Sequence, residues 1–227
     1  MSKLARPKKI GGGAANRPVA AGRRRPVTDN RSQKAAARRE AILAAALDEF
    51  SARGFAEARL DDVARKAGVA KGTIYLHFAD KEALFQELVR TMISPLVAAL
   101  VDFRAADRPI RAVLDQVAEL FVGSVGTRRR EVAQLVLSEG QRFPELAEFY
   151  YREVVERAMT AMRTMLERAI ARGEIPNAAL AHFPQLVVAP GILSIIWVGL
   201  FDRFQHLDVA AMMRTHIAIL LGQRSGS

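Results

Sequence analysis

Two short predicted helices on either side of a glycine constrain this chain more than any other feature. Leu60 to Ala67 carries apolar residues on one helical face, Gly68 ends that pattern, and Lys71 to Phe78 forms the second short helix. Glycine supplies the backbone freedom that a tight turn needs, and Ala64 is small enough to let the second helix cross the first closely. The pattern therefore predicts a helix-turn-helix.

The rest of the chain from Gln33 onward also has helical apolar spacing, interrupted by short turn signals. No run alternates apolar and polar residues for long enough to predict a strand. The expected fold class is all-α, with an N-terminal three-helix domain at 33–80 that contains the helix-turn-helix and a larger helical domain at 81–227. Pro95 predicts a kink in the fourth helix. The first expected helix carries an apolar face from Ile42 to Phe50 and ends at Gly54. The others span about 60–67, 71–78, 80–102, 107–122, 127–139, 144–172, 184–203 and 208–221.

The net charge of +10 lies mostly in the N-terminal segment. Residues 1–33 carry nine basic and one acidic side chain, residues 34–81 carry nine and seven, and residues 82–227 carry sixteen of each. Residues 1–32 are rich in Gly, Ala, Pro and Arg and lack a periodic apolar face, so they are predicted to form a disordered basic tail. That tail fits either a solvated leader or an arm that contacts nucleic-acid backbone. An organelle transit peptide fits less well, because the basic residues lack amphipathic spacing.

The second short helix is the predicted DNA-reading element. Ile74 and Phe78 face inward, which leaves the outer side and the N-terminal end of the helix to meet DNA. The N-terminal end also directs its free N–H groups and the positive end of its dipole toward phosphate. Each candidate alone is more often a packing or solvated residue, and only the shared register after the glycine turn favours DNA contact. The expected contacts are Lys71, Gly72, Thr73, Tyr75, His77 and, at the start of the next helix, Lys81.

The residues from Arg38 to Val89 resemble the DNA-binding domain of the TetR/AcrR family of bacterial one-component transcriptional regulators. The resemblance rests above all on the uninterrupted stretch over residues 68–85, which reads GVAKGTIYLHFADKEALF. It implies an all-helical homodimer, a C-terminal domain for ligand binding and dimerisation, and repression that a small molecule relieves. By position, it also assigns DNA contact to Lys71, Gly72, Thr73, Tyr75, His77 and Lys81.

Two departures from the family pattern affect the helix starts. The family often has a Thr-Thr pair before the second helix, where this chain has Ala58 and Arg59, and the usual serine at the start of the third helix is Ala70. Loss of a capping hydroxyl costs about 0.5–2 kcal/mol of helix stability and removes a neutral phosphate contact. We therefore expect Arg59 to replace part of this loss with a charged phosphate contact.

A ligand site in the C-terminal domain is expected to be an apolar hollow with few polar groups. Aromatic and methionine side chains at helical spacing are more often ordinary core residues, so each candidate also has a structural interpretation. Flexible methionines and balanced charge fit an uncharged or amphipathic small molecule, which the sequence does not identify. The candidates are Phe121, Gln134, Leu137, Glu139, Tyr150, Tyr151, Met159, Met162 and Trp197.

The last two helices are the predicted dimer interface. The helix over 184–203 is apolar on nearly every side, so one chain cannot easily cover it, and 208–221 adds a further apolar stripe. Two such helices from each chain would form a four-helix bundle whose twofold symmetry matches a palindromic DNA site. A helix in the core of a monomer is the alternative. The interface candidates are Leu193, Ile196, Trp197, Leu200, Met212, Met213, His216 and Leu220.

Several other classes of protein are disfavoured by what the sequence lacks. The chain has no cysteine and four histidines without paired metal spacing, so no metal site, cofactor or enzymatic activity is expected. The Lys71-Gly72-Thr73 stretch lacks the preceding glycine pattern of a phosphate loop, and no Gly-x-Ser-x-Gly is present. The apolar run from Leu186 to Phe201 is too short to span a membrane, which needs about 20 residues.

With this resemblance, the chain is expected to be a ligand-responsive repressor in the bacterial cytoplasm, associated with the nucleoid. It is expected to bind a palindromic operator in double-stranded DNA as a homodimer and to be released by a small apolar or amphipathic effector. In the expected mechanism, effector binding shifts the population toward a state with a moved fourth helix and a changed separation of the two DNA-reading helices. A non-specific architectural DNA-binding protein and a TetR-like activator are the alternatives.

Overall fold

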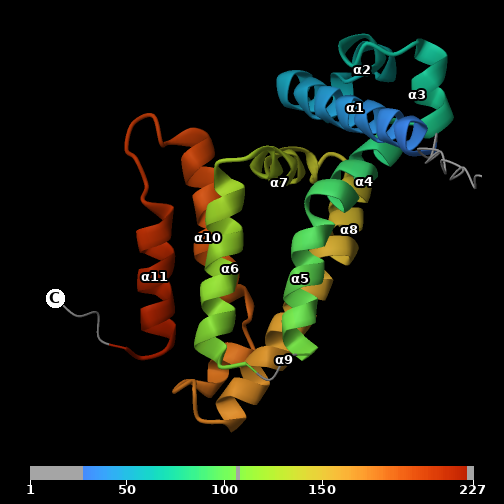
Figure 1. Ribbon diagram of the computed structural model, residues 1–227. Coiled ribbons are helices and arrows are strands. Elements are labelled where there is room, and N and C mark those ends of the chain that lie inside the picture. Colours follow the sequence, from blue (N-terminus) through green and yellow to red (C-terminus); the bar gives the residue numbers. More distant parts are fainter. Residues whose placement is uncertain (1–27, 106–107, 224–227) are drawn as a thin grey trace, which may run out of the picture.

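Every regular element is helical over residues 28–105 and 108–223, which the computed structural model describes. The absence of strands within these ranges confirms the all-α prediction. Figure 1 shows α1, α2 and α3 grouped at one end of the molecule, with the other helices extending away from them. The elements are α1 (Thr28–Glu57), α2 (Leu60–Lys66), α3 (Lys71–His77), α4 (Lys81–Met92), α5 (Ser94–Ala105), α6 (Ile110–Val125), α7 (Arg128–Glu139), α8 (Pro144–Tyr150), the π-helical turn η1 (Tyr151–Glu156), α9 (Arg157–Ala171), the 3-10 turn η2 (Ala178–Ala181), α10 (Gln185–Leu200) and α11 (Val209–Leu220).

The first helix starts earlier than the sequence predicted. It begins at Thr28, so residues 28–32, which were expected to belong to the disordered tail, are helical. The alanine-rich run after Lys34 favours helix, and Thr28, Asp29 and Asn30 are residue types that favour helix starts. The rest of the predicted tail, residues 1–27, lies outside the described residues.

A buried core holds the three N-terminal helices against one another. Phe50 of α1 and Ile74 of α3 are both buried in it. Glu49 is also fully buried, and its carboxylate pairs with Lys66 Nζ of α2 at 2.5 Å and with Arg53 Nε at 3.1 Å. A buried carboxylate is tolerated only when it is paired, so this cluster ties α2 to α1.

The same core continues past residue 80, where the sequence placed the end of the N-terminal domain. It includes Leu84, Phe85 and Leu88 of α4, together with side chains of α7 and α8. The ring of Phe55 in α1 lies 5.0 Å from the ring of Phe143, the residue before α8. The two predicted domains therefore share a packed interface.

The predicted fourth helix is broken in two. α4 ends at Met92, α5 begins at Ser94, and the two axes are bent by 41°. Pro95 lies in the first turn of α5, where its missing N–H costs no helical hydrogen bond. The kink predicted at Pro95 is therefore a break centred on Ile93, just before the proline.

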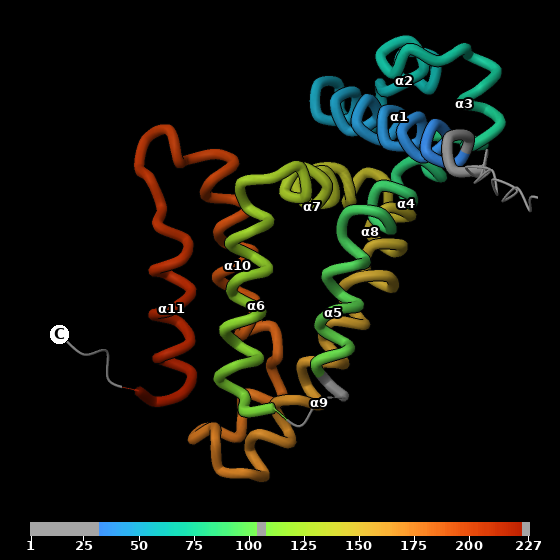
Figure 2. The backbone as a smooth tube through the Cα atoms, in the orientation of Figure 1, coloured from blue at the N-terminus to red at the C-terminus, as the bar shows by residue number. Residues whose placement is uncertain are grey.

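The C-terminal helices form two groups joined by α7. Figure 2 shows α5 beside α9 in one group and α6 with α10 and α11 in the other, with α7 crossing between them. The helix predicted over 144–172 is a continuous helical stretch, but it contains the π-helical turn η1. Such turns shift the side chains that follow them around the helix and occur often at functional sites.

No single helix in the described part of the chain is long and apolar enough to cross a membrane. Lys81–Met92 and Ser94–Phe103 together reach the necessary length and composition, although they are bent at their junction. Both helices direct apolar side chains such as Leu84, Phe85 and Val97 into the core of the protein.

Candidate DNA-reading face and ligand cavity

The turn between α2 and α3 has the geometry that the sequence predicted. Gly68 has a φ of 66°, a left-handed conformation that suits glycine and strains other residues. The Val69 N–H donates to the Ala64 carbonyl at 3.0 Å and closes the turn. Ile74 and Phe78 are buried, as expected. The opposite side of α3 therefore faces away from the protein.

Most of the predicted DNA contacts lie on this outer side of α3 or at the start of α2. Arg59 is the N-cap residue of α2 and Ala70 is that of α3, and neither side chain caps its helix. The first N–H groups of both helices therefore lack a capping side chain and can meet phosphate. The predicted contacts that are exposed are Arg59, Lys71, Gly72, Tyr75 and His77, and Thr73 is half-buried.

An acidic residue of α2 orients two of these side chains. Asp61 accepts a hydrogen bond from Lys71 Nζ at 2.6 Å and another from Tyr75 Oη at 3.3 Å. The hydrogen bond from Lys71 is the main reason that the pKa of Asp61 lies below its ordinary value, and the same bond raises the pKa of Lys71. Sequence reasoning missed this role of Asp61, because the contact forms only when the two helices cross.

Lys81 is turned toward the protein. Its ammonium donates to the carbonyls of Phe55 and Ala56, both at 2.8 Å, and lies 4.8 Å from the centre of the Phe55 ring. These carbonyls lie in the last residues of α1, where helical partners run out. Two of the three donors of Lys81 are thereby used to tie α4 to α1. Any phosphate contact by Lys81 depends on the remaining donor.

Sequence reasoning also overlooked an exposed apolar side chain on α3. Leu76 is 84% exposed and follows the partly exposed Tyr75. An apolar side chain on a DNA-reading helix can contact the methyl group of thymine in the major groove. The signal was present in the sequence, because Leu76 lies two positions after the buried Ile74 and so faces the other side of the helix.

A cavity of about 560 Å³ lies among the C-terminal helices, and α7 forms part of its wall. The wall is mostly apolar and comes from α5, α6, α7, the α8–η1–α9 stretch and α10. Ile93, at the break between α4 and α5, belongs to this wall. A volume of this size suits a small organic molecule. The polar residues in the wall are Ser124, Arg129, Arg130, Tyr150 and Gln185.

The cavity wall contains some of the predicted ligand residues and not others. Phe121, Tyr150 and Met159 line it. Met162 is instead fully buried in the core, because it lies nearly one turn beyond Met159 on the side that packs against other helices. Tyr151 follows Tyr150 but faces solvent, as does Leu137.

The other three predicted ligand residues do not belong to the cavity wall, although Gln134 contacts a residue that does. Gln134 Nε2 donates to the Ile195 carbonyl at 3.3 Å. Trp197 Nε1 donates to the Gln205 carbonyl at 2.9 Å. The carboxylate of Glu139 lies so close to Gly54 of α1 that a Cβ there would be 2.9 Å from Glu139 Oε1.

Two aromatic residues shape the cavity. Burial raises the pKa of Tyr150 to about 12, so its hydroxyl stays protonated at neutral pH. Phe121 packs directly on Gly191 of α10, where a Cβ would lie 2.4 Å from the ring. The glycine is therefore needed for the position that Phe121 takes in the wall.

Helix α7 contacts both the cavity and the N-terminal domain. In its first turn, Arg128 forms an ion pair with Asp48 of α1 and donates to the Ala44 carbonyl at 3.2 Å. The next two residues, Arg129 and Arg130, belong to the cavity wall. One turn of helix thus joins the cavity to the helix that supports the DNA-reading unit.

Helices α10 and α11 leave apolar side chains exposed on the surface of the single chain. Leu193 and Leu200 of the predicted interface are exposed, and so is Ile219, which the prediction omitted. Met213 is 2% exposed and packs in the core that α11 shares with α6, so its predicted place at an interface is wrong. The remaining predicted interface residues, Ile196, Trp197, Met212, His216 and Leu220, are half-buried.

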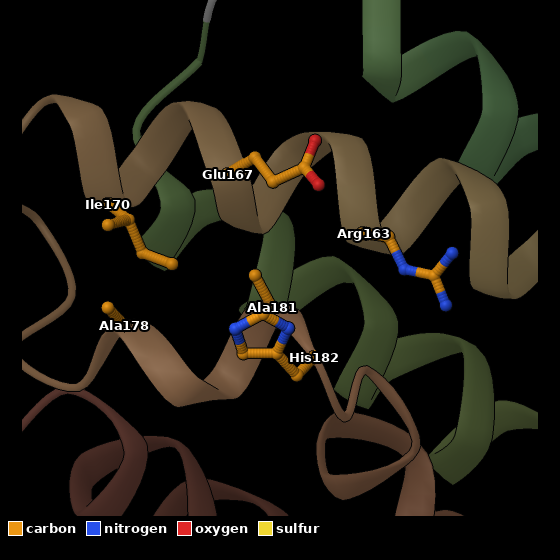
Figure 3. A pocket seen from close by; sticks show the side chains of 6 residues that line it. All are labelled: Arg163, Glu167, Ile170, Ala178, Ala181 and His182. Atoms are coloured by element: carbon orange, nitrogen blue, oxygen red, sulfur yellow. The ribbon is translucent and has the colours of Figure 1, made fainter.

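A second hollow of about 540 Å³ lies between α9 and η2. Figure 3 shows Arg163, Glu167 and Ile170 on one side of it and Ala178, Ala181 and His182 on the other. Its three titratable side chains are exposed, and no cluster of His, Asp and Glu that could hold a metal occurs among the described residues. The cavity bordered by α7 is therefore the stronger candidate for a ligand site.

A glycine turn, a buried supporting core and an outward-facing third helix define a helix-turn-helix DNA-binding protein with a second helical domain. Residues 42–88 match the family model described as "Bacterial regulatory proteins, tetR family", and residues 107–201 match "Tetracyclin repressor-like, C-terminal domain". The chain belongs to the TetR family of transcriptional regulators.

Known proteins show how far the similarity extends. The HTH-type transcriptional regulator RutR of Escherichia coli is 38% identical over 90 residues, which is 40% of this chain and 42% of RutR. The HTH-type transcriptional repressor BepR of Brucella suis is 31% identical over 63% of this chain and 71% of its own length. The solved structure of the regulator FadR from Bacillus subtilis in complex with stearoyl-CoA has a TM-score of 0.65 at 20% identity, covering 82% of this chain and 99% of that one.

Proposed function

We propose that this TetR-family protein is a ligand-responsive repressor that binds a palindromic operator as a homodimer on the bacterial nucleoid in the cytoplasm. The observation that carries the proposal is that Ile74 of α3 and Phe78, its C-cap residue, are buried, while Lys71, Tyr75 and His77 lie on the outer side of the helix. The repressor role is supported by the name of the relative BepR.

The proposed DNA contacts fall into two groups. Thr73, Tyr75, His77 and Leu76 face outward along α3 and are proposed to read base edges in the major groove. Gly72 lets the backbone approach DNA closely. Arg59 and Lys71, at the starts of α2 and α3, and the third donor of Lys81 are proposed to contact phosphate, which positions the helix without reading sequence.

The proposed dimer forms through the outer surfaces of α10 and α11. Leu193, Leu200 and Ile219 are large apolar side chains exposed on these helices. Exposed apolar side chains gathered on one surface are typical of association surfaces. A twofold pair of α3 helices, about 34–36 Å apart, would fit successive major grooves of a palindrome.

The proposed effector occupies the cavity bordered by α7. The FadR structure, which has a similar fold, was solved with stearoyl-CoA bound and supports a small-molecule effector. Ile93 belongs to the cavity wall and also separates α4 from α5. Helix α4 is tied to α1 by Lys81, so movement at Ile93 would carry to the DNA-reading unit. Effector binding would thereby favour a state in which both α3 helices no longer fit the operator.

Chromatin pull-down followed by footprinting tests this proposal. We expect a discrete footprint over a palindromic sequence. Tyr75→Ala or Lys71→Ala should lower the affinity for that site about tenfold or more. Arg152→Ala, an exposed arginine on η1, removes the same charge as Lys71→Ala away from α3 and should leave the footprint unchanged. Protection that grows with DNA length without a defined site would favour the architectural alternative, and reduced transcription of the bound genes in a deletion strain would favour an activator.

A further inference from the structure

The cavity wall has a concentration of positive charge at the first turn of α7. Arg129 and Arg130 line the cavity from this turn, and the lining residues within the described ranges include no carboxylate. This turn also carries the positive end of the α7 dipole, where cations are unfavourable unless an anion balances them. The charge at this turn therefore requires an explanation.

The neighbouring arginine shows how a charge in this helical turn is balanced by acidic side chains. Arg128 pairs with Asp48 and lies 3.6 Å from Glu131 Oε2. Arg129 and Arg130 form no comparable ion pair with any residue in the described ranges, and Arg130 Nε is buried without a hydrogen-bond partner. A buried donor of this kind favours a bound acceptor, especially a charged one.

Asp202 is close enough to Arg130 for the arginine to lower its pKa, but its carboxylate already accepts hydrogen bonds from other groups. The pKa of Asp202 is lowered first by the hydrogen bond from the Leu207 N–H, then by His206, and least by Arg130. Its Oδ1 lies 3.0 Å from the Leu207 nitrogen and 3.1 Å from His206 Nδ1. Asp202 therefore leaves the Arg130 guanidinium open to another anion.

We propose that the cavity binds an amphipathic anion, with its apolar part against the wall and its carboxylate or phosphate head group at Arg129 and Arg130. The inference rests on the proposed function, since it specifies the effector class of the same cavity. The apolar part would lie among side chains such as Val117, Phe121 and Ile192. Because Arg129 and Arg130 are half-buried in a mostly apolar wall, their contacts with an anionic head group would be stronger than those of fully exposed arginines.

Calorimetry with ten-carbon probes of different head groups tests this inference on the full-length protein. The probes are decanoate, decyl phosphate, 1-decanol and decyltrimethylammonium, which differ mainly at the head. We expect the wild type to bind one or both anions at least about tenfold more tightly than decanol, and the cation weakest. The comparison of decanoate with decyl phosphate distinguishes a carboxylate from a phosphate ligand.

Three variants locate the preference. Arg130→Gln should reduce the ratio of anion to alcohol affinity about tenfold, whereas Arg130→Lys should retain most of it because the charge remains. Arg152→Gln removes an exposed arginine outside the cavity wall and should leave the ratio unchanged. Circular dichroism and the binding of decanol itself show whether Arg130→Gln is folded.

The outcomes separate this inference from the proposed function. Equal binding of anion and alcohol by the wild type, or an anion preference that persists in both Arg129→Gln and Arg130→Gln, would overturn the head-group assignment while leaving an apolar effector possible. Failure of all four probes to bind would overturn the assignment and also count against the cavity as the effector site.

Discussion

The DNA-reading end and the cavity end are both built from helices, but their polar side chains face opposite ways. On α3, Lys71 and Tyr75 face solvent above a buried Ile74. In the cavity, Arg129 and Arg130 are polar residues in a mostly apolar wall. The first arrangement presents charge to a large external partner, and the second surrounds a small one.

The two ends also differ in how far apart their residues lie in the sequence. The α2–α3 unit runs from Leu60 to His77, whereas the cavity wall draws on residues from Ile93 to Ile195. The ends nevertheless meet in α7, where Arg128 contacts α1 next to the arginines of the wall. A DNA-reading unit made from one short stretch and a cavity made from distant segments thus share one packed protein.

The largest expected effect tests whether that shared core makes the two ends one folding unit. Ile74→Ala should lower the free energy of unfolding by about 2–5 kcal/mol, because it leaves a cavity in the core. Trp197, the single tryptophan, lies on α10 and reports on the other end. We expect tryptophan fluorescence and far-ultraviolet circular dichroism to give the same shifted urea midpoint.

A matched variant on the same helix controls for this effect. Leu76→Ala removes a side chain that is 84% exposed and should change the free energy of unfolding by less than about 0.5 kcal/mol. An unchanged tryptophan transition in Ile74→Ala would show that the two ends unfold independently.

The next effect concerns the shape of the cavity. Gly191→Ala places a methyl group against the Phe121 ring and forces the ring to move, at a cost of about 1–3 kcal/mol in unfolding free energy. We also expect weaker decanol binding by calorimetry, since the displaced ring would take up cavity space. Gly123→Ala on α6 has open space around its added methyl and serves as the control. If Gly191→Ala bound decanol as tightly as the wild type, Phe121 would not belong to the wall of the ligand cavity.

A smaller effect tests the link through α7. Arg128→Ala removes the contacts with Asp48 and the Ala44 carbonyl but leaves the arginines of the wall in place. Decanoate should weaken operator binding less in this variant than in the wild type. The coupling free energy between decanoate and operator binding should fall by about 0.5–2 kcal/mol. Fluorescence anisotropy of labelled operator with and without decanoate measures it. If decanoate weakened operator binding as strongly in the variant as in the wild type, the effect of the ligand would reach the DNA-reading helices through another element, such as α4.

The smallest effect concerns the exposed pair that orients the DNA-reading helix. The pKa of Asp61 is lower in the folded protein than its ordinary value of 3.8, so the carboxylate stabilises the fold above that pH. This contribution is lost as the pH falls through the folded-state pKa. The difference in urea midpoint between wild type and Asp61→Asn should therefore be present at pH 7 and shrink below about pH 3.8. A difference that stays constant with pH would exclude the ionised pair as its cause.

The DNA-reading unit was predictable because its pattern is complete within a short stretch. The inward positions Ile74 and Phe78 and the turn at Gly68 follow from helical periodicity and glycine conformation alone. The link from Asp61 to Lys71 was not predictable, since it depends on how α2 and α3 cross. The departures Arg59 and Ala70 were correctly placed at helix starts.

The cavity was harder to predict because neighbouring positions on one helix have different surroundings. Tyr150 lines the cavity while Tyr151 faces solvent, and the π-helical turn that begins there shifts the phase of the positions that follow. Met213 is buried while Met212 is half-buried, which depends on the packing of α11 against α6. Apolar periodicity identifies these helices but does not say which neighbour covers each side.

Selection of binding sites from a pool of random duplex DNA shows whether α3 reads a palindromic operator. The full-length protein, Tyr75→Ala and Arg152→Ala would be carried through the same selection in parallel. We expect the wild type and Arg152→Ala to enrich one palindromic motif with half-sites about one helical turn apart, and Tyr75→Ala to lose base preference within the half-sites. Enrichment of no motif by the wild type, or of the same motif with equal strength by Tyr75→Ala, would contradict the claim that α3 reads the operator.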